Sequence, residues 1–323
     1  MKSNTYIIAL TFAAAAVFAL PVSAQGYPAK PVRMIIPFSA GGAADVPGRI
    51  VTQKLAEVLR QQVVVENRPG AGSTIGADLA AKAAPDGYTV FMISNTHFVS
   101  AALHKKLAYD SLNDFTPVTQ ITSAPNVMVV HPSLPAKSVA ELVQLAKSKP
   151  GDIRFASGGV SGASHLGSEL FRVIAGVNMV HVPYKGTGPG TTALLTGEVQ
   201  MVIAGVGTLM PHAKSGKVRA LAVTGAKRSP AAPELPTVAE NGLPGYAFDV
   251  WYGVFASSKT PRATLQKINA DANTALRDAE TAKRFAGAGI DLIGGGLDES
   301  NQYLRAEMTK WAKVIREAGI TAD

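Results

Sequence analysis

The stretch IIPFSAGGAADVPGR, residues 35–49, has the pattern of a buried strand, a glycine turn and the first turn of a helix. Apolar residues then recur at helical spacing over residues 50–59. Gly41 and Gly42 permit backbone conformations that other residues avoid. Backbone N–H groups at a helix start have no intrahelical acceptor and lie at the positive end of the helix dipole. The turn therefore predicts a cradle for a small anion, with a turn that binds nothing as the alternative.

Strand and helix patterns alternate around this turn, at residues 32–37, 46–60, 63–66, 74–83 and 88–94. This βαβαβ order predicts parallel strands joined by helical crossovers. In a doubly wound sheet the first and third strands are neighbours, and their carboxyl ends open a crevice that binds ligands. Thr96 and His97 follow the third strand, so we expect both beside the glycine turn. The second-strand loop, residues 70–76, would lie one strand further out and is interpreted as a turn and helix start.

A second series of strands and helices follows, between two segments that cross from one domain to the other. The first crossing, residues 118–130, is strand-like but interrupted near Pro125, and the second lies near residues 246–256. Two such crossings act as a hinge, which lets the two halves close on a solute. We therefore predict an α/β protein of two domains. The predicted domains are residues 25–123 with 250–323, and residues 124–249.

The first 24 residues have the three parts of a secretory signal peptide. Lys2 provides the positive charge, residues 6–20 the apolar run, and the small residues VSA the cleavage site before Gln25. The apolar run is shorter than the ~20 residues that a membrane-spanning helix needs. We expect export and cleavage, with an uncleaved anchor as the alternative. The sequence contains no cysteine, which excludes disulfides, thiol nucleophiles and thiolate metal sites.

The formal net charge is +8, but the basic residues are scattered along the chain. There is no basic run and no alternation of basic with aromatic residues, so we do not expect nucleic-acid binding. A mild positive field instead favours anionic solutes. The sequence contains no GxxxxGK[ST], HExxH or EF-hand motif, so no cofactor and no metal site is predicted.

Small hydroxyl residues beside glycines are a further group of candidates in the second domain. They can donate hydrogen bonds to ligand oxygens while the backbone approaches the ligand. His97 and His165 are placed on loops at the predicted cleft, where a neutral imidazole can donate to a carboxylate. A structural role for either histidine is the alternative. The hydroxyl residues are Ser157, Ser161, Ser164 and Thr187.

Charged and aromatic residues near the predicted cleft each have two interpretations. Asp45 is placed to cap the helix after the glycine turn by accepting a first-turn N–H, or it can face an ammonium or hydroxyl of a ligand. Lys185 and Arg49 can each pair with a carboxylate or lie in solvent. Trp251, like Tyr252, can cover the carbon skeleton of a ligand or pack the hinge.

An enzymatic function would rest on one incomplete motif. GVSGA, residues 159–163, is similar to a nucleophile elbow with Ser161 as nucleophile, but it lacks the final glycine of GxSxG. A triad would also need an acid and then a histidine after the serine, and only Glu169 and Glu198 precede a later histidine in that order. A secreted serine hydrolase is therefore kept as the alternative function.

Six segments follow the predicted signal peptide in order: PFSAGGAADVPGR, ENRPGAGSTIGADLAAKAAPDGYT, SNTHF, SGGVSGASHLGSELF, HVPYKGTGPGTTALLTGEVQ and WYGVFA. Together they resemble the Bug family, the extracytoplasmic solute receptors of tripartite tricarboxylate transporters. The resemblance covers essentially the whole mature chain. Ala43 stands where relatives often have a third glycine, and Ser73 where many have glycine. Neither difference removes a backbone donor.

The resemblance implies a two-domain Venus-flytrap fold, of the type II periplasmic binding proteins, and a monomeric, non-catalytic receptor in the periplasm. It implies a small carboxylate ligand between the domains: a di- or tricarboxylate, an acidic amino acid or an aromatic acid. The implied protein partners are the membrane components of the transporter. The candidate ligand-binding residues are Phe38, Ser39, Ala40, Gly41, Gly42, Asp45, Thr96, His97, Ser157, Ser161, Gly162, Ala163, Ser164, His165, Tyr184, Lys185, Gly186, Thr187, Gly188, Pro189 and Trp251.

Overall fold

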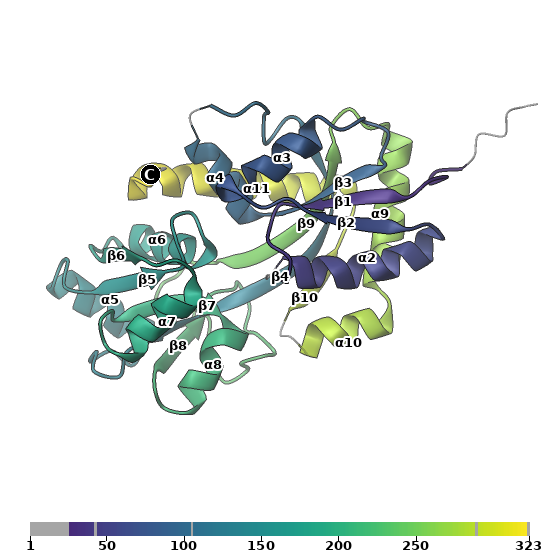
Figure 1. The fold of residues 1–323 in the computed structure, drawn as a ribbon. Helices are drawn as coiled ribbons and strands as arrows, with labels where there is room; N and C mark the ends of the chain where they lie inside the picture. Colours follow the sequence, from purple (N-terminus) through teal and green to yellow (C-terminus); the bar gives the residue numbers. More distant parts are fainter. Residues whose placement is uncertain (1–25, 42–43, 105, 288–289, 322–323) are drawn as a thin grey trace, which may run out of the picture.

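The computed structural model describes residues 26–41, 44–104, 106–287 and 290–321. These residues form two lobes of strands and helices with long strands running between them (Figure 1). The predicted signal peptide, residues 1–24, and the candidate Gly42 lie outside the described residues. No helix within the described part of the chain is long and apolar enough to cross a membrane.

The first lobe is built around the strand that opens the glycine-turn stretch. Its elements are β1 (Val32–Ile36), α2 (Asp45–Leu59), β2 (Val63–Asn67), the 3₁₀ helix η1 (Ala71–Ser73), α3 (Thr74–Ala81), β3 (Thr89–Ser94), α4 (Asn95–Leu103), α9 (Arg262–Leu276), α10 (Ala279–Gly287) and β10 (Asp291–Gly294). Strand β1 pairs in parallel with β2 on one side and β3 on the other. The predicted neighbourhood of the first and third strands is confirmed.

The second lobe repeats the alternation of strands and helices. Its elements are α5 (Val139–Ser148), β5 (Arg154–Ser157), α6 (Ala163–Ala175), β6 (Val180–Pro183), α7 (Thr187–Leu195), β7 (Met201–Gly205), α8 (Val206–Lys214) and β8 (Arg219–Val223). Strand β5 pairs in parallel with β6 and with β7. Ser138 caps α5 as its position suggests, because its hydroxyl oxygen accepts the N–H of Glu141 at 3.1 Å.

Two strands, β4 (Phe115–Val130) and β9 (Asp249–Ser257), connect the lobes. Strand β4 pairs with β9 as far as Pro125 and with β7 from Asn126 onward. The strand order is β2-β1-β3-β9-β4-β7-β5-β6, and β8 and β10 also pair with β4. The predicted interruption at Pro125 is wrong, since β4 is continuous. Proline lacks an N–H donor and is tolerated here because the strand changes partners at this point.

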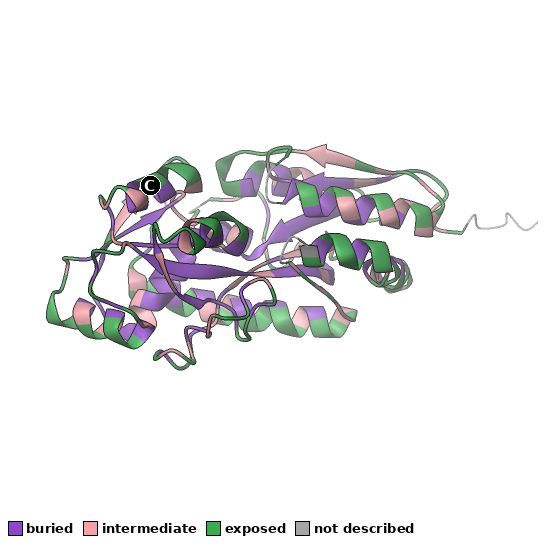
Figure 2. Ribbon diagram, turned by 90° about the horizontal axis from the view of Figure 1, so that it is seen from below, coloured by how far each residue is buried: buried purple, intermediate pink, exposed green. Residues whose placement is uncertain are grey.

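Each lobe buries both faces of its sheet. Along β1, Met34 and Ile36 belong to one apolar cluster and Ile35 to another, as the alternation of side chains in a strand requires. The strands β1, β3 and β4 are therefore buried along most of their length, whereas the edge strands β2 and β6 are partly exposed and helices are buried on the side that faces a sheet (Figure 2). The strand ends, which lie between the lobes, are fixed in position by these cores.

Four elements were not predicted from the sequence: α4, α8, α10 and β10. Helix α4 begins at Asn95 and α8 at Val206, each at the residue that follows a strand. No loop residues separate strand from helix, so the change of periodicity falls within a few residues and is difficult to detect. As a consequence His97, which was expected on a loop, lies in the first turn of α4.

The last helix, α11 (Leu297–Ala318), crosses from the first lobe to the second (Figure 1). Trp311, in its C-terminal half, is 1% exposed, and its ring lies 5.6 Å from that of Phe248. Trp311 belongs to the same apolar cluster as Leu170 and Phe171 of α6. The end of α11 therefore packs against the second lobe, and the assignment of residues 250–323 to the first domain stays a prediction. The apolar face of that segment is buried by the second lobe.

We expect the variant Trp311→Ala to destabilise the protein by about 3–5 kcal/mol, because it removes a buried indole from the core of the second lobe. Urea unfolding followed by circular dichroism measures the change. Lys313→Ala is the matched control, since its side chain is 65% exposed on the same helix and should change the free energy of unfolding by less than about 0.5 kcal/mol. Equal stability of Trp311→Ala and wild type would contradict the assignment of this helix end to the second core.

Candidate functional site

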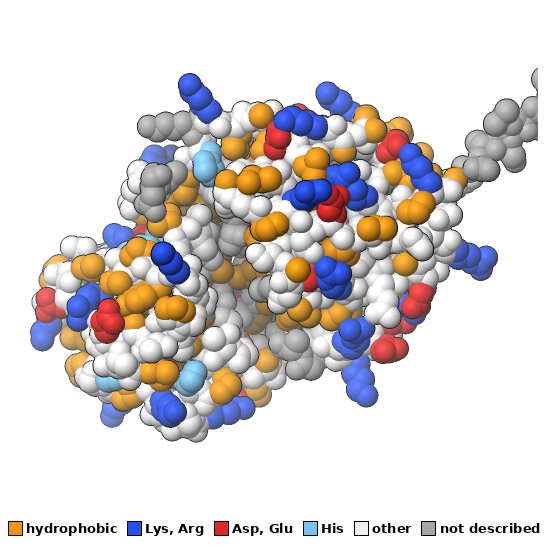
Figure 3. Space-filling view, viewed as in Figure 1, with side chains coloured by type: hydrophobic (Ala, Val, Ile, Leu, Met, Phe, Trp, Pro, Cys, Tyr) orange, Lys and Arg blue, Asp and Glu red, His pale blue; other side chains and the backbone are white. Residues whose placement is uncertain are grey.

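Five helices begin close to the ends of strands that lead into the space between the lobes. Helix α2 follows β1, α4 follows β3, and α6, α7 and α8 follow β5, β6 and β7. In sheets of this kind the carboxyl ends of the strands form the ligand crevice. The groove between the lobes is visible in the space-filling view, where most Lys and Arg side chains lie on the outer surface (Figure 3).

Two cavities occupy this groove. The first, called here the loop cavity, has a volume of about 290 Å³ and lies between the loops after β1 and β2, the helix α4 and the loop after β5. Its lining residues are Pro37, Phe38, Ser39, Pro69, Gly70, Gly72, Ser73, Thr96, Ser100, Val160, Ser161 and Gly162. The loop of residues 70–76 therefore reaches the cleft, although it was interpreted as a turn further out. It does so because η1 packs against α4.

The second cavity, called here the hinge cavity, has a volume of about 320 Å³ and includes residues of β4 and β9, the two connecting strands. Its lining residues are Ala124, Pro125, Asn126, Ala163, Ser164, Thr187, Ala204, Gly205, Val206, Gly207, Thr208, Val250, Tyr252 and Ile290. Gly162 lines the loop cavity and Ala163 lines the hinge cavity, so neighbouring residues at the start of α6 line the two cavities.

The first turns of three helices line the hinge cavity: α6 at Ala163, α7 at Thr187 and α8 at Val206. None of the three has a side-chain cap. Their first-turn N–H groups have no intrahelical acceptor and point toward the cavity end of each helix. Within the described residues no Asp, Glu, Lys or Arg lines either cavity. The hinge cavity therefore offers neutral donors at the positive ends of helix dipoles.

The glycine turn before α2 differs, because one of its N–H groups meets a carboxylate of the protein itself. Asp45 is 2% exposed and accepts hydrogen bonds from the N–H of Gly41, from Arg49 Nε and from Asn67 Nδ2, each at 2.8 Å. Burial acts to raise the pKa of this carboxyl, but the three donors outweigh it and hold the pKa below its usual range.

The prediction that Asp45 caps the helix is wrong. It is the first residue of α2, and the N–H of Gly48 donates to the carbonyl of Ala44 instead. The carboxylate of Asp45 turns back to the glycine turn, because Asn67 of the neighbouring strand β2 and Arg49 hold it there. The N–H of Gly41 is therefore occupied and is not free for an external anion.

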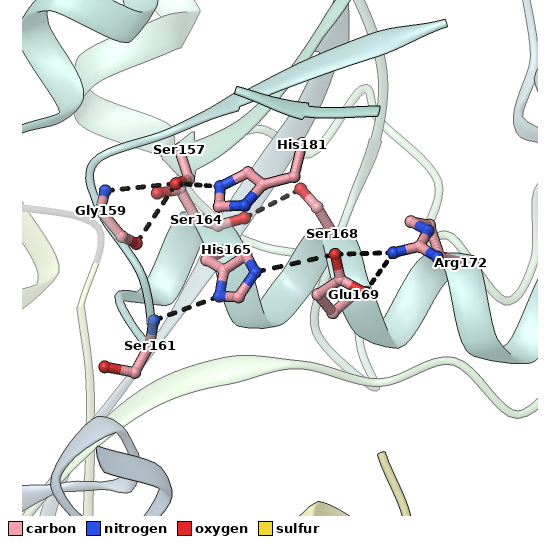
Figure 4. Close-up of polar contacts among 9 residues, drawn as sticks. All are labelled: Ser157, Gly159, Ser161, Ser164, His165, Ser168, Glu169, Arg172 and His181. Carbon is pink, nitrogen blue, oxygen red and sulfur yellow. Dashed lines mark hydrogen bonds and ion pairs between the residues drawn. The ribbon is translucent and has the colours of Figure 1, made fainter. Parts of the chain in front are cut away.

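The loop between β5 and α6 is held from beneath by a buried polar network (Figure 4). The backbone N–H of Ser161 donates to Nδ1 of His165 at 3.1 Å, so Nδ1 is an acceptor and the ring hydrogen lies on Nε2. That nitrogen lies 3.7 Å from Oε1 of Glu169, which Arg172 holds through two hydrogen bonds of 2.8 and 3.0 Å. Ser161 adopts a φ of +57°, which orients its N–H toward the histidine.

Hydroxyl groups complete this network. Ser157 Oγ lies 2.6 Å from Nε2 of His181, and the Ser164 hydroxyl oxygen accepts the N–H of Gly158 at 2.8 Å. The rings of His165 and His181 stack with centroids 4.2 Å apart. Burial lowers the pKa of His165 to about 3, and the neighbouring His181 and Arg172 add to this effect. His165 therefore supports the loop from within and stays neutral, and it does not reach the cavities.

His97 also lies in a core. Its side chain is 0% exposed, and Nδ1 lies 2.7 Å from Ser73 Oγ. The ring stacks on Tyr109 with centroids 6.2 Å apart. Burial lowers the pKa of His97 to about 3. Its contact with Ser73 fixes the loop after β2, so His97 positions a wall of the loop cavity without facing it.

The two aromatic candidates on β9 face opposite sides. Tyr252 lines the hinge cavity, whereas Trp251 is 2% exposed, stacks on Phe255 and donates from Nε1 to Glu307 at 3.3 Å. The alternation of side chains along a strand explains the difference. Of the two interpretations of Trp251, the structure agrees with packing.

The candidate residues predicted from the sequence divide by location. Those that line the cavities are Phe38, Ser39, Thr96, Ser161, Gly162, Ala163, Ser164 and Thr187. Those buried behind the cavity walls are Asp45, His97, Ser157, His165 and Trp251. Those exposed outside both cavities are Ala40, Gly41, Lys185, Gly188 and Pro189. Tyr184 donates its hydroxyl to Glu198, and the N–H of Gly186 donates to Gly158.

Sequence reasoning missed two parts of the site. Asn126 and the start of α8 line the hinge cavity, and neither was a candidate. The α8 segment has a strand, Gly205 and a helix start in succession, which is the same signal that identified the glycine turn before α2. Asn126 lies within a strand, and only its place at the change of lobes would have indicated it.

Two α/β lobes joined by crossing strands, with helix starts facing a cleft, define a solute-binding protein of the periplasmic type. A family model described as "Tripartite tricarboxylate transporter family receptor" matches residues 48–320. Protein BugT of Bordetella pertussis is 37% identical over 310 residues, covering 95% of each chain. A UPF0065 protein from the tcbD-tcbE intergenic region of Pseudomonas sp. strain P51 is 36% identical over 300 residues, covering 93% of this chain and 89% of its own.

Solved structures agree with these matches. Rpa4515 of R. palustris with adipate superposes with a TM-score of 0.77 at 33% identity, covering 91% of this chain and 99% of that one. MatC (Rpa3494) from Rhodopseudomonas palustris with bound malate gives 0.72 at 30% identity, covering 90% and 100%. The periplasmic binding protein BugD gives 0.74 at 31% identity, covering 92% and 100%. The chain belongs to the TctC family of periplasmic solute receptors, which confirms the family and the two-domain fold predicted from the sequence.

The buried His97 predicts that stability falls as the pH drops below neutral. Its pKa is about 3 in the fold and 6.5 in the unfolded chain, so between these values the unfolded chain binds a proton that the folded protein does not. The stability that the neutral, buried His97 contributes is fully retained above pH 6.5. Between pH 6.5 and about 3 the free energy of unfolding falls by roughly 1.4 kcal/mol per pH unit. Urea unfolding at pH 7.5, 6 and 5 measures this dependence.

The variant His97→Asn keeps an acceptor near the position of Nδ1 and removes the titrating group. Its free energy of unfolding should depend on pH less steeply than that of wild type. His104→Asn is the matched control, because His104 is exposed at the end of the same helix and should leave the slope unchanged. A slope for His97→Asn equal to that of wild type would count against this account of the buried histidine.

Proposed function

We propose that this receptor binds a small carboxylate in the groove between its lobes and delivers it to the membrane components of a tripartite tricarboxylate-type transporter. The anionic groups of the ligand lie at the hinge cavity, against the first turn of α6 and the neighbouring starts of α7 and α8. The loop cavity takes the adjoining part of the ligand, because neighbouring residues at the start of α6 line the two cavities.

The observation that carries the proposal is the convergence of three uncapped helix starts on one cavity. Such N–H groups bind anions without a charged side chain. Hydrogen bonds to a charged group contribute ~1.5–3 kcal/mol each. Two or three of them are sufficient for a micromolar Kd, roughly −8 kcal/mol, after the cost of association. Two relatives of similar fold were solved with adipate and with malate, which supports a carboxylate as the ligand class here.

The first lobe encloses the ligand in this proposal, whereas the sequence predicted that its glycine turn binds the anion. Because Asp45 occupies the N–H of Gly41, the glycine turn cannot present that amide to a ligand. The turn instead brings Phe38 and Ser39 to the loop cavity, where an aromatic ring and a hydroxyl cover the ligand. Charge recognition is therefore assigned to the second lobe and enclosure to the first.

The geometry does not favour the serine hydrolase alternative. Ser161 Oγ donates to the carbonyl of Val160 at 2.7 Å, and His165 receives the backbone N–H of Ser161 instead of its hydroxyl. Within the described residues the Ser161 hydroxyl has no histidine within hydrogen-bond distance to act as a general base. The family and the similar structures are solute-binding receptors.

Gly207→Val tests where the carboxylate binds. Gly207 is the second residue of α8 and lines the hinge cavity, and an added Cβ there would meet no other atom within 4 Å. The valine side chain would thus keep the backbone N–H and fill the cavity. We expect isothermal titration with malate and adipate to show binding by wild type and at least tenfold weaker binding by Gly207→Val.

Gly188→Val is the matched control, because Gly188 is the second residue of α7 but is exposed outside both cavities. It should bind like wild type. Lys185→Ala should also bind like wild type, since Lys185 is exposed and lines neither cavity. Loss of binding in Lys185→Ala, with normal binding in Gly207→Val, would show that a side-chain charge recognises the ligand and that helix starts do not.

Export is proposed from the signal-peptide pattern of the first 24 residues. The mature protein recovered from the periplasm should begin at Gln25. Intact-mass spectrometry decides this, because a chain that still begins at Met1 would favour the uncleaved anchor.

A further inference from the structure

Asn126 is a buried polar side chain at the point where β4 passes from one lobe to the other. It is 4% exposed and lines the hinge cavity. Its amide nitrogen Nδ2 has no hydrogen-bond acceptor within the described part of the chain. An unpaired buried donor costs free energy in a folded protein. A structural asparagine would be expected to satisfy this group. Nδ2 is buried in this orientation of the amide, and a ligand in the cavity that Asn126 lines can supply an acceptor once the amide turns.

The backbone around Asn126 is fixed on both sides. Its N–H donates to Thr224 Oγ1 at 2.8 Å, and its carbonyl accepts the N–H of Thr224 at 2.9 Å. In the β4–β7 ladder Asn126 lies opposite Gly205, the residue that immediately precedes α8. The side chain is therefore held beside the start of α8 by a rigid backbone, which is the arrangement that a selective contact needs.

Residues of β4 and β9 at the hinge divide between the cavity and the opposite side. Ala124, Pro125, Asn126, Val250 and Tyr252 line the hinge cavity, and Pro125 does so where β4 changes partners. Ser123 and Asp249, on the other face, bond to each other at 3.1 Å. Asn126 is thus the amide-bearing residue of β4 on the cavity face. Rotation of the amide about χ2 exchanges its two ends and can turn the NH₂ group to the cavity.

The surroundings of Asn126 define what it can bind. The described lining of the hinge cavity contains hydroxyls, apolar groups and helix-start N–H groups, and no carboxylate. An amide NH₂ there donates to an oxygen acceptor. Space is available at the start of α8 in the same cavity, because an added Cβ on Gly207 would meet no other atom within 4 Å. These features suit a second anionic group of the ligand.

We propose that Asn126, with the first turn of α8, binds the second carboxylate of a dicarboxylate ligand and so selects dicarboxylates over monocarboxylates of the same length. The inference rests on the proposed function, in which the first carboxylate binds at α6. The division is between two ends of one ligand: α6 holds the first anionic end, and Asn126 and α8 hold the second. Asn126 is then a specificity-determining residue.

The test measures Kd by isothermal titration for two ligand pairs, adipate with hexanoate and malate with 3-hydroxybutyrate. Each pair differs by one carboxylate. Wild type should prefer the dicarboxylate at least tenfold. Asn126→Leu, which keeps the size but removes the donor, should lose at least tenfold in affinity for the dicarboxylate and bind the monocarboxylate unchanged. Asn126→Asp should lose more, about a hundredfold, because its carboxylate repels that of the ligand.

Ser123→Ala is the matched control. It removes a buried hydrogen bond from the same strand, but on the face away from the cavity. It should lower the melting temperature and leave the preference for dicarboxylates intact. If a variant of Asn126 fails to fold, NMR of the wild-type protein labelled with ¹⁵N takes the place of that measurement. The side-chain NH₂ resonances of Asn126 should then shift on addition of adipate and not of hexanoate.

The outcomes separate the two proposals. If wild type binds a dicarboxylate and Asn126→Leu binds it with the same Kd and the same preference, the role of Asn126 is overturned and the proposed function stands. Unchanged NH₂ resonances in the presence of bound adipate would also overturn it. If wild type binds no carboxylate of the panel, both the proposed function and the role of Asn126 fall.

Discussion

Backbone N–H groups in the turns and helix starts around the cleft need acceptors, and the two lobes of this protein differ in whether a side chain supplies one. In the glycine turn before α2 the protein supplies its own carboxylate, since Asp45 accepts the N–H of Gly41. At α6, α7 and α8 no side chain caps the helix. These three starts converge on the hinge cavity. In the proposed function an anion from outside accepts hydrogen bonds from these starts, as Asp45 accepts the N–H of Gly41 in the first lobe.

The two connecting strands link binding to the joint between the lobes. Because side chains alternate along a strand, β4 and β9 present one row to the hinge cavity and the other to α11 and the core. Tyr252 belongs to the first row and Trp251 to the second. A ligand in the hinge cavity therefore touches the same strands that carry the chain between lobes. Helix α11 adds a further connection through Trp311, which packs in the second core.

Much of this arrangement follows from local patterns that the sequence displays. The strand, glycine turn and helix of residues 35–49 lie where the pattern places them, although α2 begins at Asp45. The second glycine-rich turn and the start of α6 also lie at the strand ends, as expected. Thr96, Ser161 and Thr187 line the cavities that these ends form. Such residues were predictable because their place depends on a few neighbours in the chain.

Other residues were misplaced because their role depends on distant partners. Asp45 has the position of a cap, yet Asn67 on the next strand draws its carboxylate to the glycine turn. His97 follows a strand as a ligand residue would, yet the loop after β2 and the aromatic ring of Tyr109 enclose it. Asn126 shows no local signal at all, because its exposure to a cavity results from the meeting of two lobes.

The sequence by itself determined the α/β units, the strand ends at which helices begin, and the family, because each is written in local periodicity and in glycine turns. Only the tertiary structure decided which helix starts remain open to a ligand and which side chains reach the cleft. The physical reason is that a donor is free or occupied according to the acceptors around it. In this protein such partners come from other parts of the chain: Asn67 of β2 bonds Asp45, and Thr224, which follows β8, holds the backbone of Asn126.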